Sequence, residues 1–274
     1  MPNLNVEYIF SKEIVKIHLM KYVLCIITCL FIGRNYAQDG ISYEKKGFNY
    51  KYSFSGGIRL RTDGWSVLGE YAQRKKYNRS MVYLWDISSY KHPKMKRQSI
   101  DPNGGIFGGG AKPFVYGKRY SLIALHGAVG QRHLLAEQAK KNGVLINFQY
   151  LGGVSLGLLK PYFINVYSDP DGLSTESITY NPDNPDIRFL DISQIAGGSG
   201  FGKGWQLKFR PGLHFQTGFQ FDWSSQEDFI KAVEIGFSYD EYFKDVPLMA
   251  IVENKARFFN LYMGIQLGKK KKIL

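Results

Sequence analysis

Hydrophobic and polar side chains alternate along several segments of the chain, most clearly at residues 205–223, WQLKFRPGLHFQTGFQFDW. The odd positions of this segment are apolar except for one threonine, and the even positions are polar or glycine. Because successive side chains of a strand point to opposite faces, the pattern predicts a strand with one apolar and one polar face. The width of the apolar face and the tryptophan at each end are typical of lipid contact framed by interfacial aromatic residues.

The segment is longer than a membrane requires. It would extend over roughly 60 Å, whereas a spanning strand needs only about 9–11 residues. Pro211 cannot donate a hydrogen bond to a sheet, so residues 210–212 are expected to form a bend or bulge. We therefore expect residues 212–223 to cross the lipid and residues 205–210 to rise above it as a ledge.

The same alternation predicts seven further strands, at residues 49–62, 65–74, 81–90, 114–129, 144–158, 230–242 and 258–268. The faces of the fourth of these cannot be assigned, because residues 121–125 are apolar at both parities. A helical turn is expected within residues 130–143. An even number of strands predicts an all-β fold, a closed antiparallel up-and-down transmembrane β-barrel of about eight strands. A ten-stranded barrel that uses parts of residues 160–203, and a soluble periplasmic β-sandwich, are the alternatives.

The connections between these strands are unequal in length, which predicts the orientation of the barrel. Long insertions at 91–112 and 160–203, with the segments 62–64 and 243–256, would face the outside. The segments 75–79, 130–143 and 224–228 would face the periplasm together with both termini, since outer-membrane barrels have short periplasmic turns and longer extracellular loops.

The N-terminus reads as an export signal. The apolar run 22–33 follows Met20-Lys21 and precedes Tyr36-Ala37-Gln38, which predicts a signal peptide at 1–37, with Met20 as an alternative start and an N-terminal anchor as the rival interpretation. The barrel domain would then occupy residues 38–274. Both cysteines, Cys25 and Cys29, lie in the apolar run, so the exported chain would contain none.

The chain is basic, with a formal net charge of +13. Cleavage after residue 37 would remove four cations and two anions and leave a charge of +11. For an exported protein, this charge predicts contact with anionic outer-membrane lipid, such as the phosphates of lipopolysaccharide, or with an acidic partner, and not with nucleic acid.

The alternation also assigns side chains to the two faces of the barrel. An eight-stranded barrel is filled by side chains, so its charged members are expected to neutralise one another as a polar network. The expected interior residues are Lys51, Arg59, Arg61, Glu70, Arg74, Asp86, Lys208, Arg210, His214, Glu234 and Asp240. The expected lipid-facing residues are Tyr52, Phe54, Phe148, Tyr150, Phe215, Phe219, Phe221, Phe259 and Leu261.

No catalytic, cofactor-binding or metal-binding residues are predicted. A hydrolase or acyltransferase needs a histidine near a serine and an acid, and neither His126 nor His214 has a serine two residues away on its own face. A serine on a neighbouring strand stays open. The sequence Asp169-Pro170-Asp171-Gly172 lacks the later ligands of a calcium loop, and the glycine-rich segments 104–110 and 197–204 lack the Lys-Ser/Thr of a phosphate loop.

With its signal-like N-terminus and alternating segments, the chain resembles small eight-stranded outer-membrane β-barrel proteins of the OmpA/OmpX-like class. The ending Tyr36-Ala37-Gln38 is similar to export signals of Bacteroidota, a phylum in which such barrels accompany secretion or assembly machines. The resemblance implies a non-catalytic outer-membrane protein, a structural or accessory subunit of a larger membrane-protein complex that acts through its extracellular loops. A lipid-modifying enzyme, such as a lipid A hydrolase or acyltransferase, and a narrow pore are the alternative functions.

Overall fold

The structure is a computed structural model, described here for residues 50–99, 112–137, 143–169, 174–184, 186–200, 202–224 and 228–272. The expected signal peptide at 1–37 lies outside these residues. Within the described ranges, no helix is both long enough and apolar enough to span a membrane.

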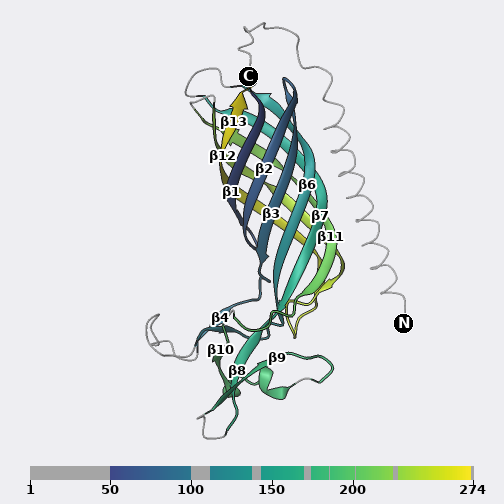
Figure 1. Cartoon of the computed structure of the whole chain (residues 1–274). Coiled ribbons are helices and arrows are strands. Elements are labelled where there is room, and N and C mark those ends of the chain that lie inside the picture. The colour runs from purple at the N-terminus through teal and green to yellow at the C-terminus, as the bar shows by residue number, and fades with distance from the viewer. Residues whose placement is uncertain are drawn as a thin grey trace, which may run out of the picture. The chain divides into compact units, whose positions relative to one another are not determined.

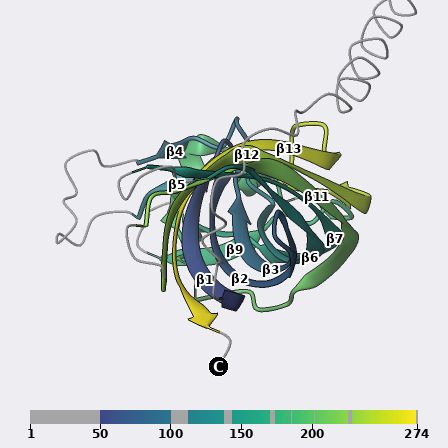
Figure 2. The same ribbon diagram turned by 90° about the horizontal axis from the view of Figure 1, so that it is seen from above.

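Eight long strands form a closed barrel (Figures 1 and 2). They are β1 (Tyr50–Arg61), β2 (Gly64–Lys76), β3 (Arg79–Tyr90), β6 (Tyr120–Ala136), β7 (Leu145–Pro161), β11 (Lys208–Asp222), β12 (Phe229–Val246) and β13 (Lys255–Lys272). Each pairs antiparallel with the next barrel strand along the chain, and β13 returns to pair with β1, so that the ring has no free edge. The expected fold class is confirmed.

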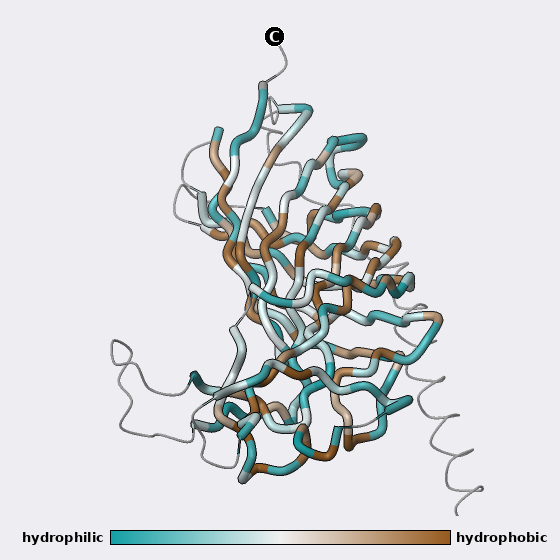
Figure 3. Tube along the Cα trace, turned by 60° about the horizontal axis from the view of Figure 1, so that its bottom comes forward, coloured by the Kyte–Doolittle hydropathy of each residue, from teal (hydrophilic) through white to brown (hydrophobic). Residues whose placement is uncertain are grey.

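The polarity of the barrel is inverted relative to a soluble protein. Hydrophobic and hydrophilic residues alternate along the strands, as the bands of colour in Figure 3 show. The large apolar side chains of the outward positions are exposed, and the inward positions hold most of the buried polar side chains, together with some apolar ones on β2, β3, β6 and β7. On β13, for example, Phe259 and Leu261 are more than half exposed, whereas the intervening Asn260 is fully buried. Closure of the ring lets the backbone N–H and C=O groups of neighbouring strands pair with one another, and the apolar exterior suits contact with lipid chains. A bilayer requires both of these properties.

Of the bend or bulge expected at residues 210–212, the bulge is absent. Strand β11 runs without a register shift along β7, and Pro211 pairs there with Leu156. On the other side, the pairing of β11 with β12 begins only at Gly212. Pro211 therefore lies one residue outside that ladder, at a position where a missing N–H is tolerated.

The fourth barrel strand differs from its prediction at both ends. Residues 114–115 belong to a separate short strand, β5 (Phe114–Val115), which pairs with β4 (Arg97–Gln98). Strand β6 begins at Tyr120 and continues to Ala136, so the helical turn expected within 130–143 is wrong for the part that extends to Ala136. The strand continues because Arg132 pairs with Ser80 on one side and Gln149 on the other.

The insertion at 160–203 folds into structure of its own. It contains β8 (Phe163–Tyr167), β9 (Thr175–Thr179), β10 (Ile195–Gly198) and two 3₁₀ turns, η2 (Ile187–Phe189) and η3 (Ile192–Gln194). The three strands form a sheet in the order β10-β8-β9, separate from the barrel, so the ten-stranded alternative is wrong. With β4 and β5 these elements form what we call the loop lobe, whose buried core consists of Phe114, Ile164, Val166, Ile178, Phe189 and Ile195.

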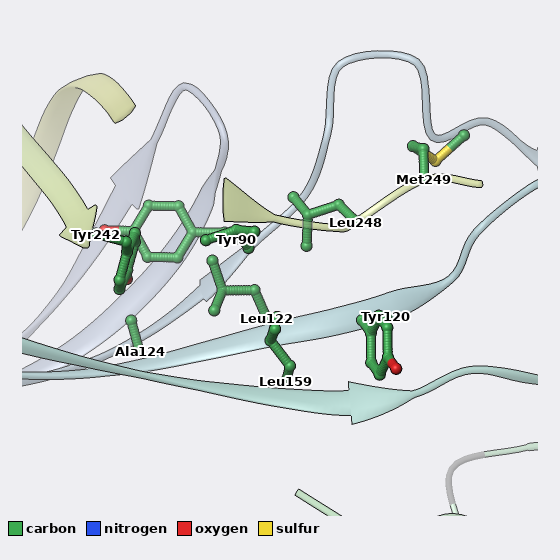
Figure 4. Close-up of a cluster of buried hydrophobic side chains, with 9 residues drawn as sticks. Tyr90, Tyr120, Leu122, Ala124, Leu159, Tyr242, Leu248 and Met249 are labelled. Carbon is green, nitrogen blue, oxygen red and sulfur yellow. The ribbon is translucent and has the colours of Figure 1, made fainter. Parts of the chain in front are cut away.

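A second apolar cluster closes the lumen next to the loop lobe. It brings together residues from β3, β6, β7, β12 and the β12–β13 loop (Figure 4): Tyr90, Tyr120, Leu122, Ala124, Leu159, Tyr242, Val246, Leu248 and Met249. Gly157 makes room for this cluster, because a Cβ atom there would lie 2.9 Å from the ring of Tyr242. We call this layer the apolar cap.

Candidate functional site

The charged residues expected inside the barrel divide into two groups. Seven are buried in the lumen: Arg59, Arg61, Glu70, Asp86, His214, Glu234 and Asp240. The other four are not, since Lys51 and Lys208 are exposed and Arg74 and Arg210 are partly exposed. These four lie near strand ends, where the interior of the barrel gives way to solvent and a charge is less costly.

The side chains expected to face lipid all lie at outward positions of their strands. Phe54, Tyr150, Phe215, Phe219, Phe259 and Leu261 are exposed, and Tyr52, Phe148 and Phe221 are partly covered by their neighbours. Several of these rings contact one another along the outer surface, such as Phe148 with Phe219 at 5.3 Å between ring centroids.

Glu234 on β12 is the acceptor around which the middle of the lumen is arranged. Arg59 donates to Oε2 of Glu234 through Nη2 at 2.7 Å and through Nε at 3.1 Å. Tyr262 donates to Oε1 at 2.6 Å, Gln266 donates to Oε2 at 2.8 Å, and Gln149 also donates to Oε1. Gly264 lets Arg59 approach, because a Cβ atom there would lie 2.5 Å from Cγ of Arg59. The carboxylate is therefore fully satisfied although it is completely buried.

Two smaller groups occupy the lumen towards the chain termini. Arg132 donates to Glu70 at 2.6 Å and to Gln149 at 2.7 Å. Further along, Lys270 pairs with Asp222 at 3.2 Å. A recess of about 40 Å³ opens near these residues, lined among others by Arg132, Asn147 and Gln220. Two of the lining residues hydrogen-bond to each other, Asn147 donating to Gln220 at 3.2 Å, and Gln220 in turn donates to Gln266 at 2.6 Å.

A pair of histidines lies between the Glu234 group and the apolar cap. Two cross-strand pairs build this part of the lumen: Asp86 on β3 is opposite His126 on β6, and His214 on β11 is opposite Asp240 on β12. The two histidines belong to strands separated by β7, and their ring centroids are 4.3 Å apart. All four side chains have no exposed surface.

Asp240 connects the two histidines. Its Oδ1 atom lies 3.1 Å from Nε2 of His126 and 2.6 Å from Nδ1 of His214. Its Oδ2 atom accepts a hydrogen bond of 2.6 Å from the hydroxyl of Tyr90. Asp240 and the two histidines offer one oxygen and two nitrogen atoms that all lie within 4.8 Å of one another, a donor set that can hold a metal ion.

A serine does lie near one histidine, on a neighbouring strand. Oγ of Ser88 is 3.4 Å from Nδ1 of His126, and the opposite ring nitrogen faces Asp240. These residue types resemble a catalytic triad. However, Ser88 donates to Asp86 and not to the histidine that would activate it. All of these groups face the closed lumen, so an acyl chain on the outside of the barrel cannot reach them.

Several lumen residues are not among those that the alternation predicts. Arg132 lies in a segment expected to be a turn, and Tyr90, Gln149 and Gln216 hydrogen-bond to charged groups on other strands. The parity of His126, carried along the strand through Ala128 to Arg132, was a signal that could have placed both charged residues inside.

Comparisons with known proteins return fold neighbours only. No family model and no curated protein matches the chain. The attachment invasion locus protein Ail of Yersinia pestis is 9% identical, with a TM-score of 0.40 over 81% of this chain and 99% of Ail. Neisserial surface protein A is 9% identical (TM-score 0.36, 81% and 97%), and the N-terminal barrel domain of Pseudomonas aeruginosa OprF is 7% identical (TM-score 0.32, 81% and 98%). The fold assignment rests on the closed strand pairing of this chain itself, which makes it a small eight-stranded antiparallel β-barrel with an apolar exterior.

Proposed function

We propose that the protein is an outer-membrane β-barrel without catalytic activity that serves as a structural or accessory subunit of a larger membrane-protein complex, such as a secretion or assembly machine. In this proposal the loop lobe lies on the extracellular side and the termini in the periplasm. The lobe is the part that meets the partner.

The observation that carries the proposal is the contrast between a filled barrel and a separately folded lobe. The lumen is occupied by hydrogen-bonded side chains and closed by the apolar cap, which leaves little for the barrel interior to transport. The lobe, in contrast, has its own core and keeps two isoleucines on consecutive 3₁₀ turns exposed, Ile187 at 84% and Ile192 at 55%. Exposed apolar side chains that lie together on an ordered surface can mark a protein contact, and the two isoleucines are only five residues apart.

Connection lengths support the proposed orientation. Three connections are on the side of the barrel opposite the first residue of β1 and the last residue of β13. They are the β3–β6 and β7–β11 connections, which supply the lobe, and the β12–β13 connection. The two-residue connection between β2 and β3 is on the same side as the first residue of β1 and the last residue of β13. Long extracellular loops and short periplasmic turns are the usual arrangement in outer-membrane barrels. The signal-like N-terminus, similar to export signals of Bacteroidota, supports export to that membrane.

The cations near the lobe support a second contact, with the phosphates of lipopolysaccharide. Lys91, Lys94, Lys96 and Arg97 follow β3 directly, and none of them forms an ion pair with a carboxylate among the described residues. Unpaired cations at the membrane surface are attracted to anionic headgroups.

The experiment is affinity capture from detergent-solubilised outer membranes with a tagged chain. We expect the wild type to recover a defined membrane-protein partner and the double variant Ile187→Glu/Ile192→Glu to lose it. Val144→Glu, an exposed position in the β6–β7 connection on the opposite side of the barrel, is the matched control and should retain the partner. Conductance of the purified protein in planar bilayers would establish a pore instead, and altered lipid A in producing cells would establish an enzyme.

A further inference from the structure

We propose that His126, His214 and Asp240 bind a divalent metal ion of the zinc type inside the barrel and thereby join strands from separate parts of the ring. This site is independent of the partner proposed for the loop lobe. The proposal follows from the acceptors that face the ring nitrogens of the two histidines.

The environment of His126 assigns the hydrogen to Nδ1. That nitrogen lies 3.1 Å from Oδ1 of Asp86, and Asp86 also accepts hydrogen bonds from Arg61 at 3.2 Å. A carboxylate paired with arginine can only accept, so Nδ1 of His126 donates to it. In the neutral ring, the lone pair is therefore on Nε2, the nitrogen that faces Asp240.

The environment of His214 presents an acceptor to each ring nitrogen. Nε2 lies 3.4 Å from Oε1 of Gln216. The orientation of the Gln216 amide is fixed, because Arg59 donates to the same Oε1 atom at 3.0 Å. Nδ1 lies 2.6 Å from Oδ1 of Asp240. A neutral ring has one hydrogen and can donate to only one of these two acceptors.

With both histidines neutral, each ring therefore leaves one lone pair opposite an acceptor, which is stable only if a further positive charge lies among these groups. The surrounding charges agree. The buried cations in contact with this part of the lumen are Arg59 and Arg61, whereas the buried anions are Asp86, Glu234 and Asp240, which leaves an excess of one negative charge. Protons on the histidines or a metal ion can supply the missing charge.

The donor set fits a metal ion well. Imidazole nitrogens and a carboxylate oxygen are ligands of zinc and similar divalent ions, with bonds of about 2.0–2.1 Å. Such bonds place tetrahedral ligands about 3.4 Å apart. His126 Nε2 is 3.1 Å and His214 Nδ1 is 2.6 Å from Asp240 Oδ1, and the three ligand atoms lie within 4.8 Å of one another, so binding requires the carboxylate to move outward and the two rings to adjust around the ion.

The surrounding residues complete the arrangement. Asp86 and Gln216 would orient the two histidines through their other ring nitrogens, which is the usual role of the outer ligand shell. The hydroxyl of Tyr90 lies 3.5 Å from Nε2 of His126 and donates to Oδ2 of Asp240 at 2.6 Å, so it would hold the carboxylate of the third ligand. Because the ligands have no exposed surface, the ion would enter as the barrel closes and would then hold β6 to β11 and β12 across the lumen.

The test is refolding in the presence and absence of metal. The chain is unfolded in urea with a chelator, refolded into detergent micelles with zinc chloride or with EDTA, and freed of unbound metal by gel filtration. Metal per folded barrel is then measured by mass spectrometry, and folding is verified by the altered electrophoretic mobility of the unheated barrel. We expect about one zinc ion per wild-type barrel, and a higher urea midpoint with zinc than with EDTA.

Matched variants locate the ion. His214→Gln and Asp240→Asn should reduce bound zinc at least tenfold, whereas His133→Gln, a partly exposed histidine on the same strand as His126, should not change it. Refolding the wild type with cobalt should give the visible absorption of a tetrahedral site, a readout that requires no variant to fold. A folded wild-type barrel that retains no zinc or cobalt would overturn the proposal in favour of protons alone, and undiminished binding by the folded His214→Gln and Asp240→Asn variants would place the ion elsewhere.

Discussion

Substitution of Glu234 by alanine tests whether the lumen is held together by its charged network. The change leaves the guanidinium of Arg59 wholly buried and without the carboxylate that accepts two of its hydrogen bonds. Breaking a buried ion pair by removing one partner costs about 3–5 kcal/mol. Tyr262, Gln149 and Gln266 lose an acceptor as well. Losses within one network do not add, so we expect a total destabilisation of about 3–5 kcal/mol.

The assay is a urea titration of the barrel in detergent micelles, with the folded fraction read from electrophoretic mobility without heating and converted to a free energy of unfolding. The double variant Arg59→Met/Glu234→Ala removes the cation that has lost its nearer carboxylate and keeps only Asp86, at 3.6 Å, and should be at least as stable as Glu234→Ala alone. A loss of unfolding free energy below about 1 kcal/mol in Glu234→Ala, the value of an exposed ion pair, would refute the reasoning. So would strictly additive effects of Arg59→Met and Glu234→Ala, each also measured alone.

Three further predictions concern the exterior and the loop lobe. Met263→Arg, in the middle of the outward apolar row of β13, should lower the free energy of unfolding in lipid vesicles by about 2–4 kcal/mol. Leu267→Arg, nearer the end of the row, should lower it clearly less. Equal losses would contradict a membrane-embedded surface. Burial, reinforced by neighbouring cations, lowers the pKa of Lys118 to about 8. The unfolded chain therefore holds more protons between about pH 8 and 10.4, so the free energy of unfolding should rise with pH across this window and lose that rise in Lys118→Met. Phe189→Ala removes a fully buried ring from the lobe core and should destabilise the lobe by about 3–5 kcal/mol. We expect faster proteolysis of residues 162–200, while the barrel keeps the electrophoretic mobility of its folded form. Loss of the folded barrel as well would show that the two do not fold separately.

Most of the barrel could be predicted from sequence because its signal is local. On β13, each outward residue from Phe259 to Leu267 alternates with an inward one from Asn260 to Gln266, and this period of two needs no knowledge of any other strand. Buried charges such as Arg59 and Glu234 were found in the same way, as the polar members of alternating runs.

The pattern was ambiguous where the lumen itself is apolar. On β6, Leu122 and Ala124 face inward, where they form part of the apolar cap. Both faces of this part of the strand are therefore apolar. The same strand reaches Arg132 only because its neighbours continue to pair with it. No property of the segment 130–136 alone distinguishes that strand from the turn that was expected there.

On strands with a clear alternation, such as β13, the sequence by itself determined which side chains point into the barrel, because alternation is a property of neighbouring residues. Tertiary structure decided which of them meet. Asp86 reaches His126, and His214 reaches Asp240, through the registers of two separate strand pairs, and the two histidines come together only when the ring closes. The proposed metal site, like the Glu234 group, therefore depends on register and closure, which are set between strands far apart in the sequence and cannot be read from any one of them.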